Sequence, residues 1–456
     1  MRIGWASTDV TPERPVALQG QFHVRISESV NDPLLATALA LESSGGEAQA
    51  VMVSCDRAGI PVAIQQRVRE AVAARLPELE PRSIFLNATH THTAPVIEEG
   101  VFPPQDPCVM TGTEYADLFV ARVADCVARA WRSRAPGGVS WGFGHAVVGH
   151  NRRIAHFGGA SQMYGRTDRE DFEHVEGYED HGVDFLFTWN EEGALTGMII
   201  NLACPSQVTE NALYVSADFW HEVRIEVAKR HGSDVFLLPQ CSAAGDQSPH
   251  LLLHKAAEAR ARELRGVTER EEIARRIAAA VDDVLPLAQA DIRRDAPLHH
   301  VARTVDLPAR RITPGDYENA VRLYRENEAR QPDPADARAV SHRFVMLRRY
   351  QRVMDAYRTQ GENPVYPVEL HLARLGDVAF ATNPFELFLD FGLRIKARCR
   401  AAQTFVVQLA GPGSYLPTAR AVAGVGYGAA PVDNRVGPEG GQVLVEATLE
   451  TLNAMW

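Results

Sequence analysis

The order of strand-like and helix-like segments constrains the fold of this chain more than any other feature of its sequence. An apolar run covers Ala50–Ser54, a helical pattern follows over 61–75, and a second apolar run covers 83–86. Short apolar runs predict buried strands, and apolar residues at three- and four-residue spacing predict amphipathic helices. Strand, helix and strand in this order favour an α/β fold.

The following segments repeat this alternation. A helix is predicted over 114–132, where apolar side chains form one stripe. Segments 183–189 and 197–202 are expected to pair as a hairpin, because turn residues separate them. A helix over 218–231 and a strand over 235–238 come next. The sequence therefore predicts a mixed β-sheet core with helices packed on it.

Residues from about 250 to 360 differ from the rest, because they are rich in Ala, Arg, Glu and Leu. This composition favours helices. We expect a helical layer or subdomain there, covering one face of the sheet within a single domain over 1–456. Two strands around a Leu-Gly-Asp turn are predicted over 368–382, and a helix over 385–400.

Composition and charge exclude several classes of function. The 456 residues are 45% hydrophobic and 23% charged, as in ordinary globular proteins, and the net charge of −11 offers nucleic acid no basic surface. The amino terminus lacks the pattern of a secretory signal, no stretch is long and apolar enough to span a membrane, and the six cysteines contain no C-x-x-C pair. We expect a cytoplasmic protein that binds a small-molecule substrate, without nucleic acid or stable membrane insertion. The sequence does not decide whether the protein forms a homo-oligomer.

Two histidines follow the predicted strand over 83–86, in the segment Asn87-Ala-Thr-His-Thr-His-Thr-Ala-Pro95. Residues two apart on an extended segment point to the same side, so His90 and His92 can act together on a metal ion and a substrate. Two loop histidines bonded to the backbone are the alternative.

Two further segments carry hydroxyl and carboxylate groups. In Leu237–Pro249 an apolar strand leads into small residues, where Ser242 is a candidate nucleophile and Asp246 could instead cap a following helix. In Thr382-Asn-Pro-Phe-Glu386 the carboxylate is either a metal ligand at a strand end or a favourable charge in the first turn of the next helix.

Tyr415 and Tyr427 lie twelve residues apart among glycines. They are loop residues rather than core aromatics, and they could recognise a ligand or anchor their loop.

Together these segments resemble the amidase domain of the neutral, non-lysosomal ceramidase family. The resemblance extends from residue 5 to about residue 430. It includes four further pieces: Ala6-Ser-Thr-Asp-Val-Thr-Pro12, Asn151-Arg-Arg153, Asn201-Leu-Ala-Cys-Pro-Ser-Gln207 and Ser216-Ala-Asp218.

The resemblance implies one catalytic zinc ion and a role for each matching residue. His90, Glu386 and Tyr415 would be zinc ligands. The remaining roles are oxyanion stabilisation by His92 and Tyr427, substrate binding by Arg152 and Asp246, and nucleophilic attack by Ser242.

The chain departs from the family at the second zinc-binding histidine, where it has Pro205. Proline cannot bind zinc. Cys204 is adjacent, but a shift of one residue turns its side chain to the other face. His221 could reach the site from the next helix, or the site could hold metal weakly or not at all.

The reaction implied is zinc-dependent hydrolysis of a carboxamide (N-acyl) bond in a small or moderately polar substrate rather than ceramide. A non-catalytic ligand-binding protein of the same fold and a metal-dependent esterase or lactonase are the alternatives. We expect few Lys or Arg residues in the pocket beyond Arg152 and Arg153, which disfavours a phosphate substrate.

Overall fold

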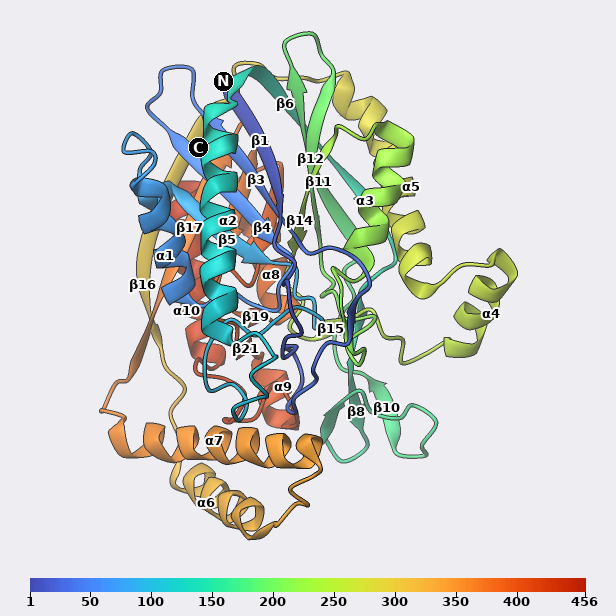
Figure 1. Cartoon of the computed structure of the whole chain (residues 1–456), viewed down its shortest axis with the longest axis vertical. Helices are drawn as coiled ribbons and strands as arrows, with labels where there is room; N and C mark the ends of the chain where they lie inside the picture. Colours follow the sequence, from blue (N-terminus) through green and yellow to red (C-terminus); the bar gives the residue numbers. More distant parts are fainter.

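The computed structural model describes residues 1–456. Two β-sheets lie face to face, and helices cover their outer faces (Figure 1). The predicted α/β class, with a mixed sheet and packed helices, is confirmed.

The larger sheet has eight strands. In spatial order they are β14 (Phe236–Cys241), β12 (Leu195–Leu202), β11 (Gly182–Asn190), β6 (Ala135–His145), β1 (Arg2–Asp9), β3 (Leu35–Glu42), β4 (Gln49–Cys55) and β5 (Ile84–Ala88). The pairs β4–β5 and β12–β14 are parallel, and the others are antiparallel. The predicted hairpin is therefore present as β11 and β12.

The smaller sheet has four strands, in the order β16 (Leu298–Pro308), β17 (Val365–Leu375), β18 (Val378–Thr382) and β20 (Gln403–Val407). Alternate residues of each strand fill the space between the sheets. On β3, Leu39 and Leu41 enter this inter-sheet core, while Ala38 and Ala40 face the helices on the other side. Because successive side chains point to opposite faces of a strand, β3 contributes both to the inter-sheet core and to the core beneath the helices.

The helices form the outer layers. Those packed on the sheets are α1 (Val62–Ala73) and α2 (Gly112–Arg132), α3 (Phe219–His231) and α5 (Glu269–Gln289), and α8 (Leu389–Arg398) and α10 (Pro438–Asn453). The others are α4 (Lys255–Arg265), α6 (Pro314–Ala329), α7 (Ala337–Thr359), α9 (Ala419–Gly424) and the short η1 (Pro81–Ser83).

Residues 250–360 contain α4, α5, α6 and α7, as the composition predicts, and also strand β16. Helices α6 and α7 form a hairpin at one end of the sheets, drawn in orange at the bottom of Figure 1. No helix has the length and apolarity needed to cross a membrane.

Short strand pairs shape the loops. They are β2 (Ser29–Val30) with β13 (Tyr214–Val215), β7 (His150–Asn151) with β15 (Gln247–Ser248), β8 (Arg153–His156) with β9 (Ser161–Met163) and β10 (Phe172–Val175), and β19 (Glu386–Leu387) with β21 (Tyr415–Leu416). The helix predicted over 385–400 begins only at Leu389, so its predicted start was wrong. Glu386 lies on β19 because its N–H donates to the carbonyl of Ser414 at 2.9 Å.

Candidate active site

His90 lies just beyond β5 in a strained conformation. Its φ is +67°, a region that residues with a side chain seldom occupy. The Nδ1 atom lies 2.5 Å from the carbonyl oxygen of Ala58, so the ring donates its Nδ1 proton there. This bond orients the ring so that Nε2 faces the cavity, as in a histidine that binds metal through that atom.

Glu386 and Tyr415 are brought together by the parallel pairing of β19 and β21, in which they are direct neighbours. The Oε2 atom of Glu386 also lies 3.4 Å from Nε2 of His90. The three residues predicted as zinc ligands therefore converge, although 296 residues (386 − 90) separate the first two along the chain.

Arg152 supports this group from behind. Its guanidinium donates to the Tyr415 hydroxyl at 3.2 Å and to the carbonyl of Gly245 at 2.9 Å, and lies 3.7 Å from Oε2 of Glu386. Burial by itself would raise the pKa of Glu386, but His90 and Arg152 outweigh it and hold that pKa at about 2. Glu386 is therefore an anion beside a permanent cation.

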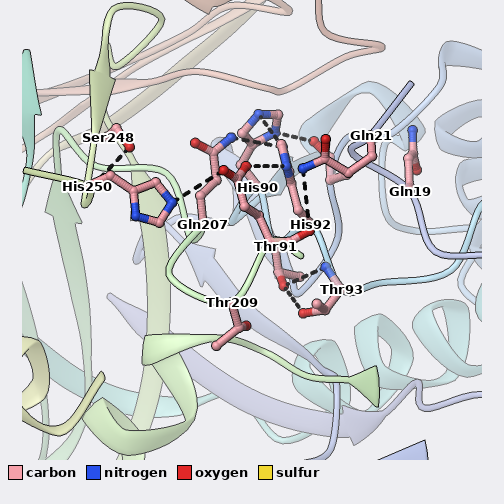
Figure 2. Close-up of polar contacts among 12 residues, drawn as sticks. Gln19, Gln21, His90, Thr91, His92, Thr93, Gln207, Thr209, Ser248 and His250 are labelled. Atoms are coloured by element: carbon pink, nitrogen blue, oxygen red, sulfur yellow. Dashed lines mark hydrogen bonds and ion pairs between the residues drawn. The ribbon is translucent and has the colours of Figure 1, made fainter. Parts of the chain in front are cut away.

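His92 turns its ring toward His90, with 3.4 Å between their Nε2 atoms. Its Nδ1 lies 3.2 Å from a carboxylate oxygen of Glu210, and the other oxygen of Glu210 lies 3.3 Å from His250. The Gln207 amide approaches Nε2 of His92 at 2.8 Å (Figure 2). Burial lowers the pKa of His92 to about 4, so the ring is neutral at pH 7 and Nε2 accepts from Gln207.

Gln207 was missed at the sequence level. Its amide oxygen accepts from Arg152 at 3.3 Å, so one buried side chain links Arg152 to His92. The signal was present, because Gln207 lies two residues after Pro205, in the segment where a histidine was expected.

Tyr427 closes one side of the site, and its hydroxyl accepts from Tyr415 at 3.4 Å. Its loop is held by Arg153, which donates to the carbonyls of Tyr427 and Val425 at 2.8 Å each. Arg153 itself is buried and paired with Glu176 at 2.9 Å. Arg153 is thus a positioning residue and not part of the cavity.

Three predicted site residues do not line the cavity, namely Arg152, Ser242 and Asp246. Ser242 is buried directly after β14, and its N–H donates to the carbonyl of Leu202. Asp246 accepts from the N–H of Leu389, at the start of α8, and from the Asn151 amide. The suggestion that Asp246 caps a following helix was wrong: it caps α8, more than a hundred residues later, and Gln247 belongs to β15.

The two candidates for the missing zinc ligand are not brought to His90. The Cys204 side chain lies in the hydrophobic core with Phe219 and Trp220, in keeping with the shift in strand phase. His221 lies on α3, and neither residue lines the cavity.

The site opens into a cavity of about 460 Å³. His90, His92, Glu386, Tyr415 and Tyr427 lie on its wall, with apolar side chains beside them. Three arginines also line it, namely Arg349, Arg352 and Arg435. The expectation of few basic residues near the site was therefore wrong, because these arginines lie in segments that carry no motif.

The separation of two of the three converging donors fits zinc. Bonds of about 2.0–2.1 Å around a tetrahedral ion place neighbouring ligand atoms about 3.3–3.4 Å apart. The His90 and Glu386 donor atoms lie 3.4 Å apart. No group of three or more His, Cys, Asp or Glu side chains in the chain is placed to hold a metal ion, so the third donor would be the phenol oxygen of Tyr415.

Comparison with solved structures shows the same fold in ceramidases. Neutral ceramidase from Pseudomonas aeruginosa superposes with a TM-score of 0.71 at 16% identity, covering 100% of this chain and 74% of that one. A ceramidase complexed with C2 gives a TM-score of 0.70 at 16% identity, with 100% and 75% coverage. No family model matches the sequence, and a search of curated proteins finds no relative. The resemblance to neutral ceramidases is thus confirmed at the level of the fold.

Proposed function

We propose that this protein is a zinc-dependent hydrolase that cleaves a carboxamide (N-acyl) bond of a small or moderately polar substrate. The observation that carries the proposal is the convergence of His90, Glu386 and Tyr415 at one end of a cavity with apolar and charged walls. The fold shared with ceramidases supports an amide as the bond cleaved.

Zinc held by His90, Glu386 and Tyr415 would act as a Lewis acid that polarises the substrate carbonyl. The Tyr427 hydroxyl lies beside that of Tyr415 and can donate a hydrogen bond to the oxyanion that develops. His92 was predicted to share this role; in its neutral ring Nδ1 lies beside Glu210 and Nε2 accepts from Gln207, so we assign it no donor role. Arg152 fixes Tyr415 and compensates the charge of Glu386.

In the proposed reaction, water adds to the amide carbon, a C–O bond forms and the C–N bond breaks. The products are a carboxylic acid and an amine, and the amine receives a proton from the water. We assign no nucleophilic step to Ser242, because the cavity does not reach it.

We also propose a cytoplasmic location. The six cysteines are all free, and four of them are buried. Unpaired thiols are typical of reducing compartments.

The proposal is tested by measuring bound zinc and hydrolysis of N-acyl amides in the purified protein. We expect about one equivalent of zinc, which His90→Ala and Glu386→Gln lose together with activity. His174→Ala is the matched control, because His174 is an exposed histidine away from the cavity. Full turnover in His90→Ala, or in zinc-free wild-type protein, would contradict the proposal.

Pro205 supports one alternative, a ligand-binding protein without catalysis, because a residue that cannot bind zinc stands where the family has a ligand. Tight ligand binding by a folded protein that takes up no zinc would favour it.

A further inference from the structure

The part of the cavity wall formed by α7 and the loop before α10 is basic. Arg349 and Arg352 lie three residues apart on α7, so they project from the same face of the helix, and Arg435 comes from the loop. Helix α7 belongs to the α6–α7 hairpin at one end of the sheets (Figure 1).

The three arginines differ in their partners. Arg349 pairs with Asp433 and lies over the ring of Phe22, 4.1 Å from its centre. Arg352 donates to the carbonyl of Val432 at 3.0 Å, and no carboxylate lies within ion-pair distance of it. The Arg435 side chain has neither an ion pair nor a hydrogen bond, although its main chain bonds to Arg310.

The two unpaired cations also repel each other. Burial, followed by the charges of Arg435 and Arg349, lowers the pKa of Arg352 to about 10. Like charges at close range are unfavourable unless an anion lies between them. Each side chain is buried only in part and keeps an exposed part at the rim, where a ligand can reach it.

The rest of the cavity wall is different in character. Glu386 supplies a negative charge beside His90, and apolar side chains contribute much of the remaining wall: Phe22, Val101, Phe102, Val345 and Pro412. A substrate that matches all of these parts has an apolar portion and an anionic group kept apart from the carboxylate of Glu386.

We propose that the substrate of this hydrolase is an N-acyl compound carrying an anionic oxygen group, carboxylate or phosphate, which Arg352 and Arg435 bind at the rim. This inference rests on the proposed function and names its substrate class. Guanidinium groups suit it, because they bind carboxylate and phosphate oxygens through paired N–H donors. A neutral N-acyl lipid would leave both cations without a partner.

The test compares charged and neutral substrates of equal size. N-octanoyl derivatives of glycine, β-alanine and 4-aminobutyrate vary the distance between amide and carboxylate, and their primary amides remove the charge. N-octanoyl phosphoethanolamine tests phosphate. We expect at least one anionic compound to exceed its neutral counterpart tenfold or more in kcat/KM, and the preferred member distinguishes carboxylate from phosphate.

Variants of the two arginines test whether Arg352 and Arg435 cause the preference for anionic substrates. In Arg352→Met/Arg435→Met the advantage of the anionic substrate should disappear through a higher KM for that substrate. Arg348→Met is the matched control: Arg348 precedes Arg349 on α7, is exposed and does not line the cavity. Equal turnover of charged and neutral substrates by the wild type, or an unchanged preference in the double variant, would overturn the inference.

Binding separates this inference from the proposed function. If no compound is hydrolysed, the proposed function fails. Thermal shifts with the same compounds still report whether the anionic members bind more tightly and whether the double variant loses that difference. Equal thermal shifts for charged and neutral compounds would contradict the inference by themselves.

Discussion

Gly20 approaches the imidazole of His92 so closely that no side chain fits between them. A Cβ atom on Gly20 would lie 2.3 Å from Cγ of His92, and the φ of Gly20 is +109°, which residues with a side chain rarely adopt. Gly20, which lines the cavity with His92, thereby fixes one side of the imidazole.

Gly20→Ala should therefore displace His92. We expect a loss of about 1–3 kcal/mol in the free energy of unfolding, together with at least a tenfold fall in kcat/KM. Gly193→Ala is the control, because Gly193 also has a positive φ, +82°, but has no atom within 4 Å of the new Cβ. Urea unfolding and steady-state kinetics measure both effects. Equal kinetic losses in the two variants would contradict a specific contact with His92.

Gln207→Ala should separate metal binding from catalysis. Removing the amide takes a hydrogen-bond partner from both Arg152 and His92, and we expect kcat/KM to fall about 10–100-fold. Bound zinc should stay at the wild-type level, because none of the three converging donors is altered. Loss of zinc from this variant would instead identify Gln207 as a ligand.

Arg153→Met should destabilise the protein by about 3–5 kcal/mol, because it leaves the buried carboxylate of Glu176 without a counter-charge. The loop of Tyr427 also loses its hydrogen bonds to Arg153. Urea unfolding measures the first effect and limited proteolysis of this loop the second. The double variant Arg153→Met/Glu176→Leu should recover much of the stability but not the protection of the loop.

Two stacked histidines predict an acid-sensitive fold. The rings of His300 and His371 lie nearly parallel, with their centres 5.4 Å apart, and both stack on Phe85. Burial, with smaller contributions from the facing histidine and Arg69, lowers the pKa of His300 to about 3; Glu369 acts in the opposite direction. Burial also lowers the pKa of His371.

A histidine with a lowered pKa binds its proton more readily in the unfolded state. Its contribution to stability is therefore complete above about pH 6.5 and is lost as the pH falls from there toward 3. We expect His300 to lower the free energy of unfolding by about 1–2 kcal/mol between pH 7 and pH 5, and His371 to act in the same direction. His300→Phe keeps the stacking and should reduce that fall. An identical pH dependence in wild type and variant would contradict this account.

The sequence predicted those elements whose pattern is local. The strands around the Leu-Gly-Asp turn were correct, because apolar runs flank the turn and Gly376 adopts its positive φ. Strand β6 could not be predicted, because glycines interrupt its pattern. Gly142 is needed there, since a Cβ would lie 2.3 Å from the side chain of Val284 on α5.

The site residues also divide into those that a local motif predicts and those that only the fold brings to the cavity. His90, Glu386 and Tyr415 could be named because each lies in a motif that resembles a known family. Arg352 and Arg435 could not, since only the packing of α7 against the loop before α10 makes them neighbours of the cavity. The start of α8 was misplaced for a related reason: the hydrogen bond from Glu386 to Ser414 is formed between distant segments, and it prevails over the local helical pattern.

The α6–α7 hairpin lies outside the two sheets, whereas the strand ends and the β19–β21 pair carry the groups that would perform the reaction. Arg352, one of the two residues proposed to select the substrate, thus lies in a stretch of the chain separate from the three proposed zinc ligands. Mutations in the hairpin can change which molecule is accepted while the geometry around His90 and Glu386 is preserved. A fold organised in this way can acquire new substrates without rebuilding its chemistry.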